Sequence, residues 1–147
     1  MYGEASPASD APALPLPQIS QDYAPFYEGV AAHKLLVQQC AACGTVNHPP
    51  QVMCPSCQGL DFGWRESGLE GILYSYTVHH HPPLAGFASP HPVGLAEMED
   101  GFRLVAALHG LEADGPAIGM KLRVEFFTRE DGFPLFRFVP AAEGEGA

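Results

Sequence analysis

Four cysteines, the only ones in this 147-residue chain, lie close together in the segment CAACGTVNHPPQVMCPSC, residues 40–57. They form two C-x-x-C pairs that are separated by ten residues. Each pair brings two sulfur atoms onto one tight turn, and two such turns facing each other complete a tetrahedron around one ion. The spacing predicts a zinc ribbon with one Zn²⁺ or, in its place, iron. The predicted ligands are Cys40, Cys43, Cys54 and Cys57.

Two other uses of paired cysteines fit this sequence less well. A redox-active C-x-x-C normally needs one pair at a helix N-terminus in a βαβ setting, and neither pair has that context. Disulfides are rare in a reducing cytoplasm, and the N-terminal MYGEASPASD shows no secretory signal, so a cytoplasmic location is expected. With four protein ligands the ion has no open coordination position, so its expected role is structural.

The chain is acidic. Its 7 Lys and Arg residues stand against 17 Asp and Glu residues, which gives a formal net charge of -10. Nucleic-acid binding draws much of its affinity from basic side chains that neutralise phosphates, and no basic stripe is present. No apolar run approaches the length of a membrane span. We expect neither nucleic acid nor membrane as a partner, although a nucleic-acid-binding module stays the alternative interpretation, since zinc ribbons and OB-folds both occur in that class.

The chain divides into segments of different character. Residues 1–19 are rich in Pro, Ala and Ser and keep no helix or strand period, so a disordered arm is predicted. Residues 20–34 are predicted to hold a short helix, residues 35–65 the zinc ribbon and residues 66–140 a barrel. Residues 141–147, AAEGEGA, are expected to form a flexible tail.

The short helix is predicted over residues 22–33. Asp22 is the expected N-cap, and Pro25 falls within the first turn, where a missing N–H is harmless. Phe26 and Val30 belong to its apolar face.

Short strands are predicted for most of the remaining sequence. Asp-Gly pairs at 100–101 and 131–132 are strong hairpin signals, because Gly tolerates the positive φ of tight turns. Five strands in about seventy residues are typical of a small OB-type barrel, with an antiparallel sandwich as the competing architecture. The predicted fold is therefore mainly β: a short N-terminal helix, a zinc ribbon and a five-stranded OB-fold barrel. The predicted strands are LLVQQC and LDFGWRE in the ribbon, then ILYSYTVHH, VGLAEME, FRLVAALHG, KLRVEFFTR and FPLFRFVP.

A second unusual segment, TVHHHPPLAGFASPHP, covers residues 77–92. His79 and His81 would share one face of a strand, so a second metal site is one interpretation and catalysis by a histidine is another. A stiff surface loop that docks a partner, or lines its substrate channel, is the favoured interpretation, because such loops lose little entropy on binding. The candidate loop residues are His79, His80, His81, Pro82, Pro83 and Phe87.

Catalytic motifs are not evident. The sequence has no G-x-S-x-G, P-loop or Rossmann glycine pattern. Glu97, Glu99 and Asp100 lie at a predicted hairpin end, where a solvated turn is the expected role. No catalytic residue is predicted.

Several stretches together resemble one family. They are PFYEGV, the ribbon QQCAACGTVNHPPQVMCPSC, LYSYTVHHHPPLAGF and the terminal PLFRFVP. Over about residues 22–139 the chain is similar to the domain of unknown function thirty-five family, which implies a rubredoxin-like zinc ribbon followed by an OB-fold. The four ribbon cysteines correspond to metal ligands of that family, and HHHPPLAGF corresponds to a candidate docking or channel-lining segment.

The resemblance also implies a function. Proteins of this family are commonly bound to acyl-CoA enzymes of the thiolase superfamily, including lipid-transfer-protein-like thiolases that act as aldol lyases in steroid side-chain degradation, and some are fused to hydratase-type domains. The thiolase-like subunit carries the catalytic residues. This chain is then expected to be a non-catalytic, zinc-containing accessory subunit of an aldolase or acyltransferase, in a hetero-oligomer with two copies of it.

Charge bears on how such a complex would hold its substrate. Coenzyme A is polyanionic and the chain is acidic, so the partner is expected to hold the CoA thioester. Leu84 and Phe87 would then shape the acyl end. A free-standing enzyme that uses one of the histidines is a third interpretation.

Overall fold

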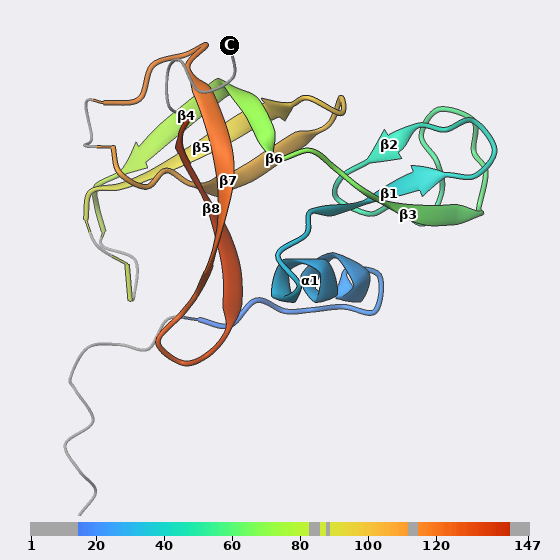
Figure 1. The fold of residues 1–147 in the computed structure, drawn as a ribbon, viewed down its shortest axis with the longest axis horizontal. Coiled ribbons are helices and arrows are strands. Elements are labelled where there is room, and N and C mark those ends of the chain that lie inside the picture. The colour runs from blue at the N-terminus through green and yellow to red at the C-terminus, as the bar shows by residue number, and fades with distance from the viewer. Residues whose placement is uncertain (1–14, 83–85, 88, 112–114, 142–147) are drawn as a thin grey trace, which may run out of the picture.

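The computed structural model describes residues 15–82, 86–87, 89–111 and 115–141. These residues form one helix and eight strands, and the strands make up two sheets. Figure 1 shows their arrangement. The elements are α1 (Ala24–Ala31), β1 (Leu36–Cys40), β2 (Val46–Asn47), β3 (Phe62–Glu66), β4 (Glu70–His79), β5 (His91–Met98), β6 (Arg103–Ala107), β7 (Lys121–Thr128) and β8 (Pro134–Pro140). The prediction of a mainly β fold with one short helix is confirmed.

The first lobe is a three-stranded antiparallel sheet with the order β2-β1-β3. β1 is central: Gln38 lies opposite Asn47 of β2 on one side and opposite Trp64 of β3 on the other. The two strands predicted for the ribbon correspond to β1 and β3. The two-residue strand β2 was not predicted, because Val46 and Asn47 are too short a stretch to show a period.

The second lobe is a five-stranded sheet with the order β6-β5-β4-β7-β8. Its two edges meet through a parallel bridge between Leu108, just after β6, and Phe138 of β8. This bridge closes the sheet on itself and distinguishes a barrel from a sandwich. Both Asp-Gly hairpins are confirmed, since Gly101 and Gly132 have φ values of 88° and 87°.

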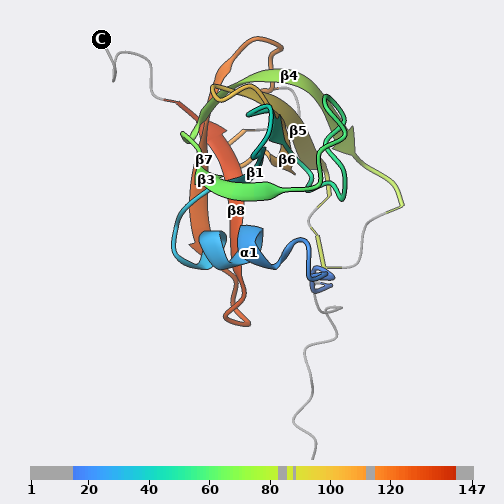
Figure 2. The same ribbon diagram turned by 90° about the vertical axis from the view of Figure 1, so that its right-hand side faces the viewer.

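Helix α1 lies below the junction of the two lobes, beside the β7–β8 hairpin, in both Figure 1 and Figure 2. Pro25 occupies its first turn as expected. The expected cap is wrong: the N-cap residue is Tyr23, and no side chain caps the helix. Asp22 precedes this position, so packing of Phe26 and Val30, 2% and 0% exposed, stabilises the helix in place of a cap.

One continuous core joins helix, ribbon and barrel. Phe26 and Val30 of α1 and Leu35 and Val37 at the start of the ribbon belong to the same buried cluster as the barrel interior. Such a shared core fixes the ribbon relative to the barrel, because separating them would expose the apolar side chains of both. The barrel contributes Leu73, Ala96, Met98, Phe102, Leu104, Ala106, Leu108, Leu122, Val124 and Phe138.

His48, from the HPP segment between the cysteine pairs, lies at the centre of this junction. Its ring centroid is 5.0 Å from that of Phe26 on α1 and 5.8 Å from that of Phe102 beside the β5–β6 turn. Burial lowers the pKa of His48 to about 4. The imidazole is therefore neutral at pH 7 and acts as an aromatic packing group.

Acid should weaken the fold through His48. Because the pKa of His48 is lower in the folded chain, the unfolded chain takes up a proton at this residue at a higher pH than the folded chain does. The contribution of His48 to the free energy of unfolding is therefore complete above about pH 6.5 and falls as the pH drops towards 4. We expect His48 to account for a loss of about 2 kcal/mol between pH 7 and pH 5. Urea unfolding at both values should show a smaller pH dependence in His48→Gln. Loss of metal in acid affects the wild-type chain and His48→Gln alike. An equal pH dependence of the free energy of unfolding in the two proteins would therefore contradict this role of His48.

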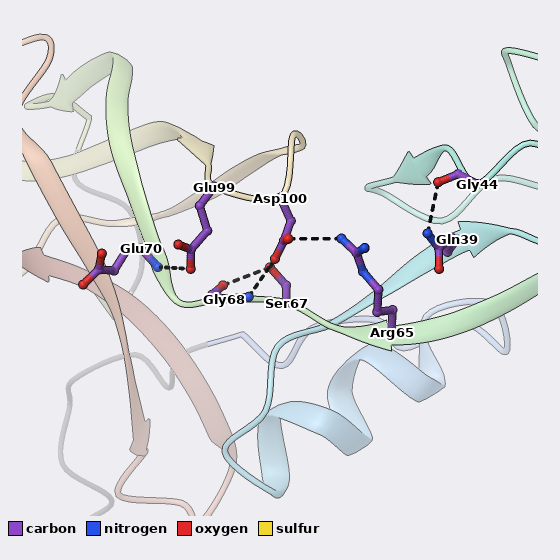
Figure 3. A network of polar contacts seen from close by, with 8 residues as sticks. All are labelled: Gln39, Gly44, Arg65, Ser67, Gly68, Glu70, Glu99 and Asp100. Carbon is purple, nitrogen blue, oxygen red and sulfur yellow. Dashed lines mark hydrogen bonds and ion pairs between the residues drawn. The ribbon is translucent and has the colours of Figure 1, made fainter.

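Asp100 makes a second connection between the lobes, shown in Figure 3. Its carboxylate accepts hydrogen bonds from the Gly68 N–H at 2.8 Å and the Ser67 hydroxyl at 2.9 Å, and it pairs with Arg65 of β3 at 3.2 Å. The Gly68 N–H, the Ser67 hydroxyl and the Arg65 charge lower the pKa of Asp100. The expectation of a merely solvated turn residue is therefore wrong for Asp100, which holds the segment that links ribbon to barrel.

Removing this carboxylate should destabilise the chain. Asp100→Ala deletes two hydrogen bonds to a charged acceptor and is expected to lower the free energy of unfolding by about 1–3 kcal/mol at pH 7. The matched control is Asp22→Ala, which should change it by less than about 0.5 kcal/mol because Asp22 does not cap α1. Chemical unfolding measures the free energy of unfolding of both variants. Equal losses in Asp100→Ala and Asp22→Ala would rule out the proposed role of Asp100.

Candidate functional site

The four cysteines converge at the end of the ribbon lobe. Their Sγ atoms all lie within 4.8 Å of one another. The Sγ atoms of Cys40 and Cys57 are 3.6 Å apart, as are those of Cys43 and Cys54. A tetrahedron of sulfurs about 2.3 Å from a zinc ion has edges of about 3.8 Å, so the spacing fits one Zn²⁺.

Both cysteine pairs lie on turns of the same backbone geometry. The N–H of Cys40 donates to the carbonyl of Thr45, and the N–H of Cys54 donates to the carbonyl of Gly59, each at 2.9 Å. The residue four positions after each first cysteine donates back to its carbonyl, at 2.9 Å and 2.8 Å. Neither pair begins a helix, so the local structure gives no support to a redox C-x-x-C.

Hydrogen bonds from Thr45 and Gly59 favour thiolates at Cys43 and Cys57, although at Cys57 the neighbouring sulfurs of Cys40 and Cys43 outweigh the Gly59 N–H and raise the pKa to about 12. The Thr45 hydroxyl lies 3.0 Å from the sulfur of Cys43 and, with the Thr45 backbone, lowers the pKa of that thiol to about 6. The Gly59 N–H donates to the sulfur of Cys57 at 3.4 Å. A side chain at Gly59 would place its Cβ 3.2 Å from that sulfur, so glycine permits this close approach. Polarised thiolates in a closed set of four suit a structural metal ion.

The histidine-rich segment does not form a comparable cluster. β4 ends at His79, so His80 and His81 lie beyond the strand and the expectation of a shared strand face is wrong. Among the described residues, the cysteines are the only group of three or more potential ligands that converge. Thus the second metal site gains no support from the described residues.

The described residues of the loop after β4 nevertheless make contacts with one another and with β5. The Ser89 hydroxyl donates to the carbonyl of His80 at 2.7 Å, and the ring of Phe87 lies 4.8 Å from that of His91 at the start of β5. His80, His81 and Pro82 are exposed, and Phe87 is 39% exposed. Pro83 and Leu84 lie outside the described residues. The loop therefore presents histidine and aromatic side chains to solvent.

Apolar side chains are also exposed on the ribbon, next to the cysteines. Val52 and Met53 immediately precede Cys54 and are 79% and 51% exposed, and Leu60 is 66% exposed. Large apolar groups gathered on one small lobe are typical of a protein interface. The sequence interpretation did not single out these residues, because nothing in VMCPSC distinguishes an exposed Val from a buried one.

Comparison with known proteins agrees with this geometry. A family model described as the ChsH2 rubredoxin-like zinc ribbon domain matches residues 28–63, and one described as the ChsH2 C-terminal OB-fold domain matches residues 64–127. A solved structure described as the Ltp2-ChsH2(DUF35) aldolase includes a chain 38% identical to this one, with a TM-score of 0.81 over 86% of this chain and 100% of that chain. The chain belongs to the DUF35/ChsH2 family. A DUF35 protein from Sulfolobus solfataricus, 19% identical with a TM-score of 0.59 over 80% of this chain and 83% of that chain, shares the fold.

Curated members of the DUF35/ChsH2 family give the functional context. A probable enoyl-CoA hydratase alpha subunit of Thermomonospora curvata is 38% identical over 89% of this chain, and the 3-oxo-4,17-pregnadiene-20-carboxyl-CoA hydratase alpha subunit of Mycobacterium tuberculosis is 33% identical over 89%. The chain spans only 41% and 42% of these two relatives. A DUF35 domain-containing scaffold protein of Methanocaldococcus jannaschii is 29% identical over 67% of this chain and 72% of the relative. In the described part of the chain, no helix is long and apolar enough to cross a membrane.

Proposed function

We propose that this chain is the zinc-containing accessory subunit of an acyl-CoA-processing complex in which a thiolase-like subunit performs aldol cleavage of a steroid side-chain thioester. The observation that carries the proposal is the 38% identity and TM-score of 0.81 to a chain of the Ltp2-ChsH2(DUF35) aldolase, over the whole of that chain. Acyl transfer by a related thiolase-like subunit is the alternative reaction for such a complex. The two hydratase alpha subunits among the relatives link the fold to the same kind of thioester substrate.

Within this proposal the chain acts as a scaffold. Cys40, Cys43, Cys54 and Cys57 hold one structural Zn²⁺, and this closed site supports the ribbon without taking part in the reaction. Exposed apolar groups on the ribbon and the loop that carries Phe87 are the proposed contacts with the partner or its substrate channel. The acidic character of the chain supports a division of labour in which the partner binds the CoA phosphates.

Assembly and domain division complete the proposal. A thiolase-like dimer would carry two copies of this chain, one on each side. The predicted boundaries, with the ribbon at residues 35–65 and the barrel at 66–140, define the units that the complex would use. The cytoplasm, where acyl-CoA thioesters are handled, is the proposed location.

The test is reconstitution with the thiolase-like protein of the same host. Each protein alone and the two together are assayed for aldol cleavage of a CoA thioester whose acyl group is a β-hydroxylated steroid side chain. We expect activity only from the mixture, and the Kd for CoA of the isolated chain should be at least about tenfold weaker than that of the complex. Full activity from the thiolase-like protein alone, or from this chain alone, would contradict the accessory role.

A further inference from the structure

A partly open groove of about 500 Å³ lies on the barrel, away from the cysteine cluster. Its walls come from the loop that follows β4, the facing parts of β5 and β6, and the β7–β8 hairpin. In OB-folds, the loops between the first two strands and between the last two strands flank the ligand-binding face. Here these are the connections β4–β5 and β7–β8, so the groove occupies the position at which this fold binds its ligands. The lining residues are Gly86, Phe87, His91, Val93, Ala107, Leu108, His109, Phe127, Arg129, Leu135, Phe136 and Arg137.

The chemistry of the lining is unusual for so acidic a chain. None of the lining residues is Asp or Glu, although the chain has 17 of them. Two of its 7 Lys and Arg residues line this one groove together with His91 and His109: Arg129, which is paired with Asp131, and Arg137, which is paired with Glu125. The remaining walls are aliphatic and aromatic. An apolar cavity of 300–1,000 Å³ with a few converging polar groups is typical of small-molecule sites.

Arg137 is oriented for binding an anion. Its Nε donates to Oε2 of Glu125 at 2.6 Å, and the centre of its guanidinium lies 4.5 Å above the ring of Phe127. Glu125 thus holds one edge of the guanidinium and Phe127 supports its face, while its terminal nitrogens make no hydrogen bond to any described residue. A planar guanidinium held in this way can donate two parallel hydrogen bonds to a carboxylate.

We propose that this groove binds a small organic carboxylate with a flat apolar body. The apolar body would lie against the aromatic wall of Phe87 and Phe127, and the carboxylate would meet Arg137. A nucleic-acid strand fits less well, because the chain lacks a basic track for successive phosphates. The site is separate from the metal centre, and it goes beyond the proposed function: it shares only the Phe87 loop with the proposed partner contact, and its ligand is tested on the isolated chain.

The probe is 2-naphthoate, titrated into the metal-loaded full-length chain and followed by calorimetry and by perturbation of amide NMR signals. The neutral isostere 2-naphthamide is the matched ligand. We expect naphthoate to bind at least about tenfold more tightly than naphthamide, equivalent to about 1.4 kcal/mol, with perturbations around residues 86–91 and 134–137. Arg137→Gln should remove this preference, because it replaces the charged guanidinium with a shorter, neutral amide.

Arg123→Gln is the matched control, since Arg123 lies on β7 outside the groove and should leave binding unchanged. If Arg137→Gln fails to fold, Phe87→Ala takes its place. This variant should fold, because Phe87 belongs to an exposed loop, and it should weaken the binding of both ligands, because it removes part of the aromatic wall of the groove. Equal affinity for naphthoate and naphthamide, an equal loss in Arg123→Gln, no binding at millimolar ligand, or tighter binding of a single-stranded oligonucleotide would each overturn the proposal.

Discussion

Replacing Cys54 with serine is expected to release the metal ion and unfold the ribbon lobe. Cys54 is fully buried, and its sulfur lies 3.6 Å from that of Cys43. A structural zinc site contributes about 10–16 kcal/mol of apparent binding free energy that is also folding free energy, and a serine hydroxyl is a far poorer zinc ligand than a thiolate. This is the largest effect that a single side chain of this protein should have.

Metal content and near-UV circular dichroism test this prediction together. The wild-type chain should carry one ion, and Cys54→Ser should lose most of it along with the near-UV signal to which the half-buried Trp64 of β3 contributes. Ser56→Ala is the matched control, because Ser56 is an exposed residue of the same turn and alanine keeps its backbone N–H. A variant that loses its metal while its near-UV spectrum stays unchanged would show that the ion does not hold the ribbon together.

Truncating Phe26 to alanine is expected to have the second-largest effect, about 3–5 kcal/mol of the free energy of unfolding. Phe26 is 2% exposed, and its ring contacts Phe136 of the barrel at 5.6 Å and His48 of the ribbon at 5.0 Å between centroids. One side chain of the helix therefore packs against both the ribbon and the barrel. Its loss leaves a cavity where helix, ribbon and barrel meet, so all three should become less stable.

Urea unfolding followed separately by tryptophan fluorescence and by far-UV circular dichroism measures this effect. Trp64 reports on the ribbon, and the far-UV signal is dominated by the barrel strands. We expect both midpoints to fall together in Phe26→Ala, because the core is shared. The control is Ile118→Ala, which truncates a 63% exposed side chain and should change little. A loss confined to one probe would argue for two independent lobes.

The sequence predicted the parts of this fold that depend on local spacing. The C-x-x-C pairs predict two turns, the Asp-Gly pairs predict two hairpins, and runs of β-branched and aromatic residues predict the strands. Each of these signals acts over a few residues. Helix α1 illustrates the limit, because Asp22 has the chemistry of a cap but the helix begins two residues later, where Phe26 can reach the core.

Long-range contacts could not be predicted in the same way. Asp100 lies 32 residues from Gly68 along the chain, and no pattern in the sequence pairs them. His48 belongs to a motif that was recognised, yet its role as a buried neutral ring depends on Phe26 and Phe102, which come from other elements. The groove around Arg137 likewise forms only when the barrel closes. The family resemblance agrees with the metal ligands predicted from the cysteine spacing, but it gives no indication of these contacts.

In the proposed complex, a metal-stabilised ribbon and barrel serve a thiolase-like enzyme. Native mass spectrometry of the protein, purified gently from its own host, tests this most directly. We predict a species that contains one metal ion per copy of this chain, bound to a thiolase-sized partner in equal numbers, two of each. A metal-loaded monomer without a partner under the same conditions would contradict the account.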